Sequence, residues 1–247
     1  MSGRTQHKPF RYFKAMNKKL ICLLFMTTAL VVAGQNFKEG TMLLKKMHDQ
    51  YSYKPCRSYS FSQKNTHYKN DTVSGHSEWH ENIEFPDKFR IVFGSPEDGN
   101  RILFRNDSVF RYRKNILLRS GRDSSSLLLI LGGMYYRPYN DVLERLKKAG
   151  FNINVLSDQT WNGQAVYVMG AKEGDVVSNQ IWVEKKNLKV VRILENTGDV
   201  QMDMRFESHQ PLCKGYIENK VSFRRNGKME QVEEYFNVVE NTPFPEK

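Results

Sequence analysis

The sequence has few cysteines and lacks the motifs of the common enzyme classes. It contains three cysteines in 247 residues, none of them in a Cys-x-x-Cys pair, which excludes the usual dithiol redox site. It also contains no Gly-x-Ser-x-Gly, His-Glu-x-x-His or Gly-x-Gly-x-x-Gly motif and no glycine loop that would hold phosphate. Acidic residues are scattered over polar positions, so no catalytic carboxylate pair can be chosen. The absence of these motifs does not exclude an enzyme, but it favours binding, and we expect a protein without enzymatic activity and without a cofactor.

Long apolar runs are also absent. The run from Leu20 to Val32 is too short to cross a bilayer comfortably, and the small residues Ala33 and Gly34 follow it. Six basic residues and no acidic one precede the run, which is the layout of a secretory signal peptide. Residues 1–34 are therefore predicted to be an N-terminal extension and signal peptide, with Met16 as an alternative start. A retained membrane anchor is the alternative to cleavage.

The net charge does not indicate a nucleic-acid partner. Removing the six basic residues of the N-terminal segment lowers the formal net charge from +11 to about +5. The remaining sequence shows no face of Arg and Lys with interleaved aromatic residues, which a phosphate backbone would require. We therefore expect no nucleic acid among the partners.

Two cysteines remain after the predicted cleavage. Cys22 lies within the apolar run and is badly placed to become a lipidated N-terminus. Cys56 and Cys213 would reach an oxidising compartment, where a disulfide is permitted. Because they lie far apart in the sequence, we favour two buried free thiols, with a structural disulfide as the alternative.

One amphipathic helix is predicted directly after the signal peptide. In the segment NFKEGTMLLKKMHDQY, Asn36 and Glu39 have the spacing of a capping pair. Leu44, Met47 and Tyr51 then recur at helical spacing. This apolar stripe is typical of a helix that packs against a core.

Most of the remaining chain alternates polar and apolar residues, as antiparallel strands do. Turn formers separate the strands, among them Ser74-Gly75, Asp98-Gly99, Asn106-Asp107 and Asn162-Gly163. A helical insertion interrupts the pattern, with DSSSLLLILGG followed by RPYNDVLERLKKAGF, a helix with Pro138 at its start and Gly150 as its C-terminal stop. The sequence thus predicts one mainly β domain over residues 35–247, with about ten or eleven antiparallel strands, an N-terminal helix and a mid-chain helical segment.

One predicted strand carries residues that could bind a metal ion. In HSEWHENIEF, His76, Glu78 and His80 fall on one face and Trp79 on the other. Two histidines and a carboxylate are a known ligand set. A fourth ligand is not evident nearby, so we favour the solvated face of a sheet and expect no metal site.

The segment NQIWVEKKNLKVVRI, residues 179–193, predicts a β-hairpin with apolar residues on both faces. A loop centred on Lys186-Asn187 gives these cross-strand pairs: Val183 with Val190, Ile181 with Arg192, Trp182 with Val191 and Glu184 with Lys189. One face then collects the aliphatic side chains together with Arg192. The other face carries Trp182, which is either covered by a neighbouring element or part of a docking surface.

The order of these features resembles the LolA-like family of periplasmic lipoprotein carriers and outer-membrane lipoprotein-sorting proteins. The segments that carry the resemblance are the signal peptide, the first helix, EFPDKFRIVF, DGNRILFRNDSVFRY, the helical insertion, QAVYVMGA and NQIWVEKKNLKVVRI. The resemblance covers roughly residues 37–244. The resemblance implies an incomplete antiparallel β-barrel closed by helices, with an apolar concavity that receives acyl chains in the periplasm.

Strand parity within this implied fold gives the candidate site residues. Those expected to line the apolar cavity are Leu44, Met47, Phe85, Phe89, Ile91, Phe93, Leu128, Ile130, Ile181, Val183 and Val190, with the first helix and residues 127–131 as a lid. Each of them is also a normal core residue by type. Arg192 is the candidate for the polar head group of a ligand, with an exposed rim arginine as the alternative.

One departure from the family concerns the cargo. The family's best-known motif has an arginine immediately before the proline of this strand, where this sequence has Phe85 before Pro86. Lipid or apolar-ligand binding is therefore better supported than lipoprotein hand-off in particular. The expected partners are lipoprotein acyl chains or lipid, an inner-membrane donor and an outer-membrane acceptor, with the protein itself a monomer. An envelope-stress sensor or scaffold with the same half-barrel and an exported hydrolase are the alternatives.

Overall fold

The computed structural model describes residues 37–52, 57–123, 125–213 and 215–245. The predicted signal peptide and the alternative start lie outside these ranges, as does Asn36 of the predicted capping pair. The described residues belong to one compact unit. In the part of the chain that is described, no helix is long and apolar enough to span a membrane.

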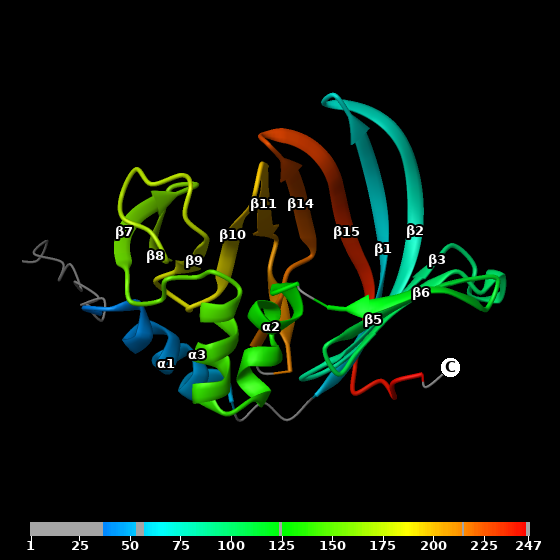
Figure 1. The fold of residues 1–247 in the computed structure, drawn as a ribbon, viewed down its shortest axis with the longest axis horizontal. Helices are drawn as coiled ribbons and strands as arrows, with labels where there is room; N and C mark the ends of the chain where they lie inside the picture. The colour runs from blue at the N-terminus through cyan, green and yellow to red at the C-terminus, as the bar shows by residue number, and fades with distance from the viewer. Residues whose placement is uncertain (1–36, 53–56, 124, 214, 246–247) are drawn as a thin grey trace, which may run out of the picture. The chain divides into compact units, whose positions relative to one another are not determined.

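Most of this unit is one antiparallel sheet of thirteen strands (Figure 1). In chain order the strands are β1 (Ser58–Lys69), β2 (Thr72–Glu84), β3 (Lys88–Phe93), β4 (Arg101–Arg105), β5 (Ser108–Arg113), β6 (Ile116–Arg122), β7 (Leu156–Trp161), β8 (Gln164–Met169), β9 (Gln180–Glu184), β10 (Val190–Thr197), β11 (Val200–Glu207), β14 (Lys220–Arg225) and β15 (Lys228–Glu240). β12 (Gln210–Leu212) and β13 (Gly215–Ile217) form a separate two-stranded ribbon.

The spatial order of the strands is β6-β5-β4-β3-β2-β1-β15-β14-β11-β10-β9-β8-β7. Two meanders, β1–β6 and β7–β15, are therefore joined by the pairing of β1 with β15. The edges β6 and β7 do not pair with each other among the described residues, so the barrel is incomplete. The predicted half-barrel is confirmed. It has more strands than expected because β6 and the β12–β13 ribbon are also present.

Turns with left-handed backbone join most of these strands. Asn106-Asp107 and Asn162-Gly163 have positive φ angles, as the two-residue hairpin turns require. The predicted turn at Ser74-Gly75 is wrong, because both residues lie within β2. The turn occurs instead at Asn70-Asp71, with φ angles of 52° and 59°, since Asn and Asp tolerate this conformation better than most residues.

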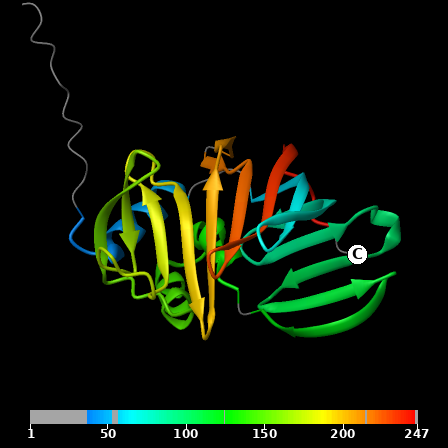
Figure 2. The ribbon, with the colours of Figure 1, turned by 90° about the horizontal axis from the view of Figure 1, so that it is seen from above.

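Three helices cover one face of the sheet, which we call the inner face (Figures 1 and 2). They are α1 (Gly40–Tyr51), α2 (Leu127–Leu131) and α3 (Tyr139–Lys148), and the 3-10 turn η2 (Gly133–Tyr136) lies between α2 and α3. A second 3-10 turn, η1 (Pro96–Asp98), connects β3 and β4. α3 has the predicted ends, with Pro138 at its N-cap and Gly150 just beyond its C-terminus. α1 starts later than predicted, and its N-cap Glu39 makes no side-chain capping bond.

The helices pack on the inner face over β8–β11. Leu44 and Met47 of α1, Ile130 of α2 and Leu146 of α3 are buried there against sheet residues such as Ile193. We call this region the packed half of the inner face. Because its side chains fill the space between helices and sheet, burial of this apolar surface is a main source of stability for the unit.

The β9–β10 hairpin has an apolar residue set on each face. The observed pairs are Val183 with Val190, Trp182 with Arg192 and Ile181 with Ile193. The first pair is as predicted, whereas the predicted Ile181–Arg192 and Trp182–Val191 pairs are wrong, because a bulge at Val191 adds one residue to β10. Ile181 and Val183 join the packed half, and Trp182 lies in a separate outer-face cluster with Val191 and Val168.

Cys213 is disulfide-bonded. The favoured prediction of a free thiol at this position is therefore wrong. Cys22 and Cys56 both lie outside the described residues.

Candidate functional site

The inner face is incompletely filled beside the packed half. A cavity of about 100 Å³ lies between α2 and strands that include β1, β2, β3, β14 and β15. Its apolar and aromatic wall comprises Tyr59, Phe61, Trp79, Ile83, Phe85, Phe89, Ile91, Leu127, Leu128, Leu131, Phe206, Val221, Phe223 and Tyr235. Its acidic residues are Glu81, Glu218 and Glu233. None of the described residues that line it is basic. We call this region the cavity half of the inner face.

Strand alternation builds the aromatic wall, because every second residue of a strand faces the same side. The rings of Phe61 and Tyr235 have centroids 4.3 Å apart, and those of Tyr59 and Phe85 are 5.9 Å apart. Phe85 also stacks on Tyr136 of η2 at 5.2 Å. The wall therefore continues from the sheet into the helical segment.

The short helix α2 covers the cavity. Leu127, Leu128 and Leu131 line it, whereas Ile130 is fully buried in the packed half. At Gly132, directly after the helix, a Cβ atom would lie 2.3 Å from the Phe85 ring. A glycine is thus needed for α2 to approach the aromatic wall this closely.

Three glutamates face this apolar space. Glu81 is 5% exposed and Glu233 is 7% exposed. Burial raises the pKa of Glu81 well above its ordinary value, and repulsion from Glu233 and Glu218 adds to the effect. Burial also raises the pKa of Glu218 and of Glu233 to about 7. These carboxyl groups therefore hold protons at a pH where an exposed glutamate is fully ionised.

The polar groups around the glutamates are unevenly satisfied. Glu233 accepts hydrogen bonds from Tyr235 Oη at 3.0 Å and from Gln231 Nε2 at 2.7 Å. Glu81 has no hydrogen-bond or ion-pair partner among the described residues. Gln63 is fully buried and interacts with Glu233, but its Oε1 has no donor. A buried polar atom without a partner costs about 1–3 kcal/mol.

The predicted ligand residues separate into two groups. Phe85, Phe89, Ile91 and Leu128 all line the cavity. Leu44, Met47, Ile130, Ile181, Val183 and Val190 lie in the packed half, where each is buried. Phe93 belongs to neither group, and its ring packs edge-on against Trp79 at 4.9 Å. The candidates on β3, in the segment just before it and on α2 thus meet at the cavity, except Phe93 and Ile130. The candidates on α1 and on the β9–β10 hairpin are core residues of the packed half.

The predicted position of Arg192 is wrong. The bulge at Val191 turns its side chain to the outer face, where the guanidinium lies 4.8 Å from the Trp182 ring centroid and donates to Asp203 at 2.6 Å and 3.0 Å. Burial opposes the ionisation of Asp203, but hydrogen bonds from Arg192 and Arg205 outweigh it and lower the pKa of this carboxyl. Arg192 is therefore part of an outer-face ion pair and does not line the cavity.

The sequence interpretation missed the three glutamates. The alternation of side chains along β2 could have revealed Glu81, because Glu81 lies between Trp79 and Ile83 on the same face of this strand. Glu233 and Tyr235 share a face of β15 in the same way. Nothing in the sequence indicated that β15 would pair with β1, and this pairing brings Glu233 to the side of the sheet that holds Glu81.

The strand face with His76, Glu78 and His80, where no metal site was expected, lies on the outer face of β2, away from the cavity. His80 Nδ1 is 2.8 Å from Ser62 Oγ, and His76 Nδ1 is 3.3 Å from Thr66 Oγ1. Both imidazoles therefore interact with hydroxyl groups of the neighbouring strand β1.

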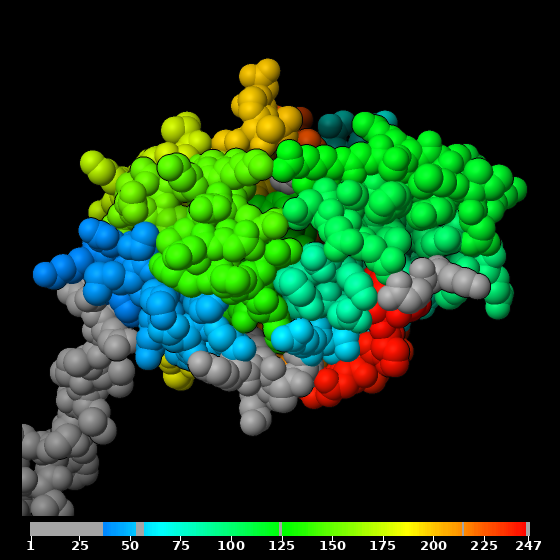
Figure 3. Space-filling view, turned by 60° about the horizontal axis from the view of Figure 1, so that its bottom comes forward, coloured from blue at the N-terminus to red at the C-terminus, as the bar shows by residue number. Residues whose placement is uncertain are grey.

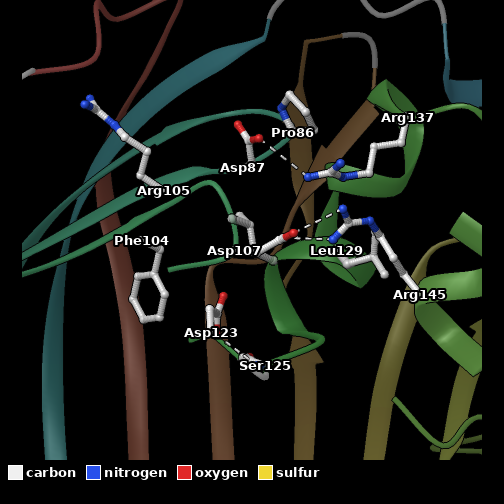
Figure 4. A pocket seen from close by; sticks show the side chains of 11 residues that line it. Pro86, Asp87, Phe104, Arg105, Asp107, Asp123, Ser125, Leu129, Arg137 and Arg145 are labelled. Carbon is white, nitrogen blue, oxygen red and sulfur yellow. Dashed lines mark hydrogen bonds and ion pairs between the residues drawn. The ribbon is translucent and has the colours of Figure 1, made fainter. Parts of the chain in front are cut away.

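A polar cleft lies where the helical segment meets the strands β4–β6, and Figure 3 shows the surface hollowed between them. Its volume is about 440 Å³. Arg145 donates to Asp107 at 2.8 Å and to Asp141 at 3.0 Å, and the hydrogen bond from Arg145 lowers the pKa of Asp107. In the adjoining pocket Arg137 lies 3.7 Å from Asp87 (Figure 4). The ion pair of Arg145 with Asp107 therefore ties α3 to the β4–β5 turn.

Comparison with known proteins bears on the fold. No protein-family model matches the sequence, and no curated protein matches it. The structure is similar to a DUF1329-family protein from Desulfovibrio piger, with a TM-score of 0.56 and 14% identity over 83% of this chain and 93% of that one. An outer-membrane lipoprotein-sorting protein domain from Vibrio parahaemolyticus gives a TM-score of 0.56 and 14% identity over 84% and 94%. A LolA superfamily protein from Nitrosomonas europaea gives 0.54 and 12% over 82% and 94%.

The chain has a LolA-like fold. This confirms the resemblance drawn from the order of the sequence segments. At identities of 12–14% the similarity extends to the fold alone, so what this chain binds has to be argued from its own cavity.

Proposed function

We propose that this protein is a non-enzymatic carrier that binds the acyl chains of a lipoprotein or another lipid under α2 and moves them across the periplasm toward the outer membrane. The observation that carries the proposal is the apolar-walled cavity that the protein's own side chains leave unfilled. Two neighbours with the same fold are named as a LolA superfamily protein and a lipoprotein-sorting domain, which supports the same class of function.

An acyl chain needs such a surface in order to cross water. Exposure costs about 0.8 kcal/mol per methylene, so a sixteen-carbon chain requires on the order of 12 kcal/mol of shielding. Phe89, Ile91 and Phe206 supply part of this apolar contact area from the sheet, and the leucines of α2 supply it from the opposite side.

A long chain requires α2 to move. A cavity of about 150 Å³ takes a molecule the size of benzene, and the cavity here is about 100 Å³. α2 is the element best suited to yield, because it has only five residues and most of its leucines are partly buried. A hydrogen bond from Ser126 Oγ to Glu195 and the burial of Ile130 hold it in the covered position.

A carrier of this kind exchanges its cargo at two membranes. We include an inner-membrane donor and an outer-membrane acceptor in the proposal, with the carrier acting as a monomer. Cargo transfer would begin with displacement of α2 at the donor and end with its return after release.

The proposal is tested by titrating purified protein with the uncharged apolar dye N-phenyl-naphthylamine and by mass spectrometry of co-purifying lipids. Dye fluorescence should rise on binding. Ile91→Ser should weaken binding by about tenfold or more, because a polar hydroxyl group then faces the apolar dye. Val177→Ser, at a position that is 74% exposed, is the control and should bind as the wild type does. Lipid-free protein that binds no dye would refute the carrier function.

A further inference from the structure

The cavity half contains polar groups that an acyl chain alone does not explain. A wall built only for methylene groups would have no reason to include a carboxylate, because burying a charge without a partner is costly. Here Glu81 lines the cavity, is 5% exposed and has no partner among the described residues.

Gln63 gives a second, independent indication of a missing group. It is 0% exposed, and its Oε1 has no donor. On β1 it pairs with Trp79 of β2 and with Tyr235 of β15. Each of these partners is two residues from a glutamate on the same face, so Gln63 is a diagonal neighbour of both Glu81 and Glu233. Side chains in this relation are within reach of one another.

The unsatisfied atoms define the chemistry of the missing group. The Glu81 carboxylate and Gln63 Oε1 are acceptors, and Asn65 Nδ2, farther along β1, is a donor that also lacks a partner. A primary ammonium has three N–H donors and no acceptor. Its positive charge would offset the carboxylates, for which the described lining supplies no basic residue.

We propose that the cavity binds a cationic amphiphile, with an apolar chain against the aromatic wall and a protonated primary amine held by Glu81 and Glu233; Gln63 lies behind these two glutamates and is not among the residues that line the cavity. This inference rests on the proposed carrier function and narrows its cargo. An anionic fatty acid is the least favoured ligand, because its carboxylate would meet three glutamates.

Proton release is an independent readout of this arrangement. The pKa of Glu233 and of Glu218 is raised to about 7 in the empty cavity, and a nearby cation favours the ionised form of a carboxyl. Binding of the ammonium near pH 7 should therefore release protons. The heat of binding should then differ between buffers of different ionisation enthalpy.

The test compares three ten-carbon ligands that differ only in the head group. Decylammonium chloride, 1-decanol and sodium decanoate are titrated into the purified full-length protein in a calorimeter, below their aggregation concentrations. Decylammonium should bind about tenfold or more tightly than decanol, and decanoate should bind most weakly. Decylammonium should release protons on binding, any bound decanoate should take them up, and uncharged decanol should show no buffer-dependent heat.

Two variants test whether the preference for the amine depends on the Glu81 carboxylate. Glu81→Gln should remove the preference for the amine while leaving the affinity for decanol within about twofold. Glu78→Gln removes the same charge from the exposed outer face of the same strand, and it should keep the preference. Melting curves at the titration pH check that both variants are folded.

The outcomes separate the two proposals. Equal affinity of the wild type for decylammonium and decanol would overturn the cationic cargo and leave the carrier function intact. A preference for the amine that survives Glu81→Gln would overturn the assignment to Glu81. If none of the three ligands binds, the carrier function fails and this inference fails with it.

Discussion

Both halves of the inner face are built by the same alternation of side chains along the strands, but one half is closely packed and the other encloses a cavity. In the packed half, Leu44, Met47 and Ile193 are at most 1% exposed, and the helices fill the space above the sheet. In the cavity half, α2 covers a space of about 100 Å³ in which carboxylates stand among aromatic rings. Close packing stabilises a fold, whereas unfilled space and unpaired polar atoms weaken it. The cavity half therefore has the composition of a site kept for a ligand.

Apolar residues of the same type should therefore contribute differently in the two halves, to stability in the packed half and to ligand binding in the cavity half. A Leu or Ile in the packed half is surrounded on all sides, and its truncation leaves a hole. A Leu or Ile at the cavity already borders empty space, so its truncation enlarges that space at a smaller cost. The following predictions test this difference, from the largest expected effect to the smallest.

The largest effect should come from truncation in the packed half. Leu44→Ala should lower the free energy of unfolding by about 2–5 kcal/mol. Ile91→Ala in the cavity half should lower it by about 1 kcal/mol or less, because Ile91 is only partly buried. Urea denaturation measures both. Similar losses in the two variants would show that the halves are packed alike.

The next effect concerns the contact between α2 and the aromatic wall. Gly132→Ala should cost about 1–3 kcal/mol, because the added Cβ would lie 2.3 Å from the Phe85 ring. Gly121→Ala on β6 is the matched control, since nothing lies within 4 Å of its added Cβ. A Gly132→Ala variant as stable as the control would mean that α2 does not rest on Phe85 in solution.

The next prediction concerns Arg192 on the outer face, whose substitution should change stability and leave dye binding unchanged. Arg192→Ala should lower stability by about 1–3 kcal/mol, because it removes two hydrogen bonds from the buried Asp203 and leaves Arg205 as its cation. The affinity for the apolar dye should stay unchanged. A parallel loss of dye binding in folded protein would return Arg192 to the ligand site.

The smallest effect, taken per group and per pH unit, is a pH dependence that arises from the cavity half. A carboxyl whose pKa is raised on folding stabilises the protein below the ordinary glutamate pKa of 4.5, and this stabilisation is lost as the pH rises through about 7. Each such group contributes a slope of at most about 1.4 kcal/mol per pH unit. Unfolding measured from pH 4 to pH 8 should therefore show stability that falls with pH.

Glu81→Gln should reduce this slope and raise the melting temperature at pH 8 more than at pH 4, because burial keeps Glu81 protonated at a cost that grows with pH, and glutamine does not titrate. Glu78→Gln on the outer face should leave the slope as it is. A wild-type slope that Glu81→Gln does not change would show that Glu81 is solvated.

Local patterns in the sequence determined most of the elements. Period-two alternation predicted the strands, Pro138 and Gly150 predicted the ends of α3, and Asn162-Gly163 predicted a hairpin turn. These signals involve residues close in the chain, where steric and hydrogen-bonding preferences act without help from the rest of the fold. The order of the segments was enough to indicate the LolA-like fold.

Only the tertiary structure decided which residues form core and which border a cavity. Leu44 and Ile91 have the same apolar character, and what separates them is whether a helix fills the space above them. The bulge at Val191, which moved Arg192 to the outer face, depends on pairing with β9. The meeting of Glu81 and Glu233 depends on the β1–β15 pairing, which joins residues far apart in the chain. Alternation gives the face of a strand to which a side chain points, and long-range packing decides what that side chain meets there.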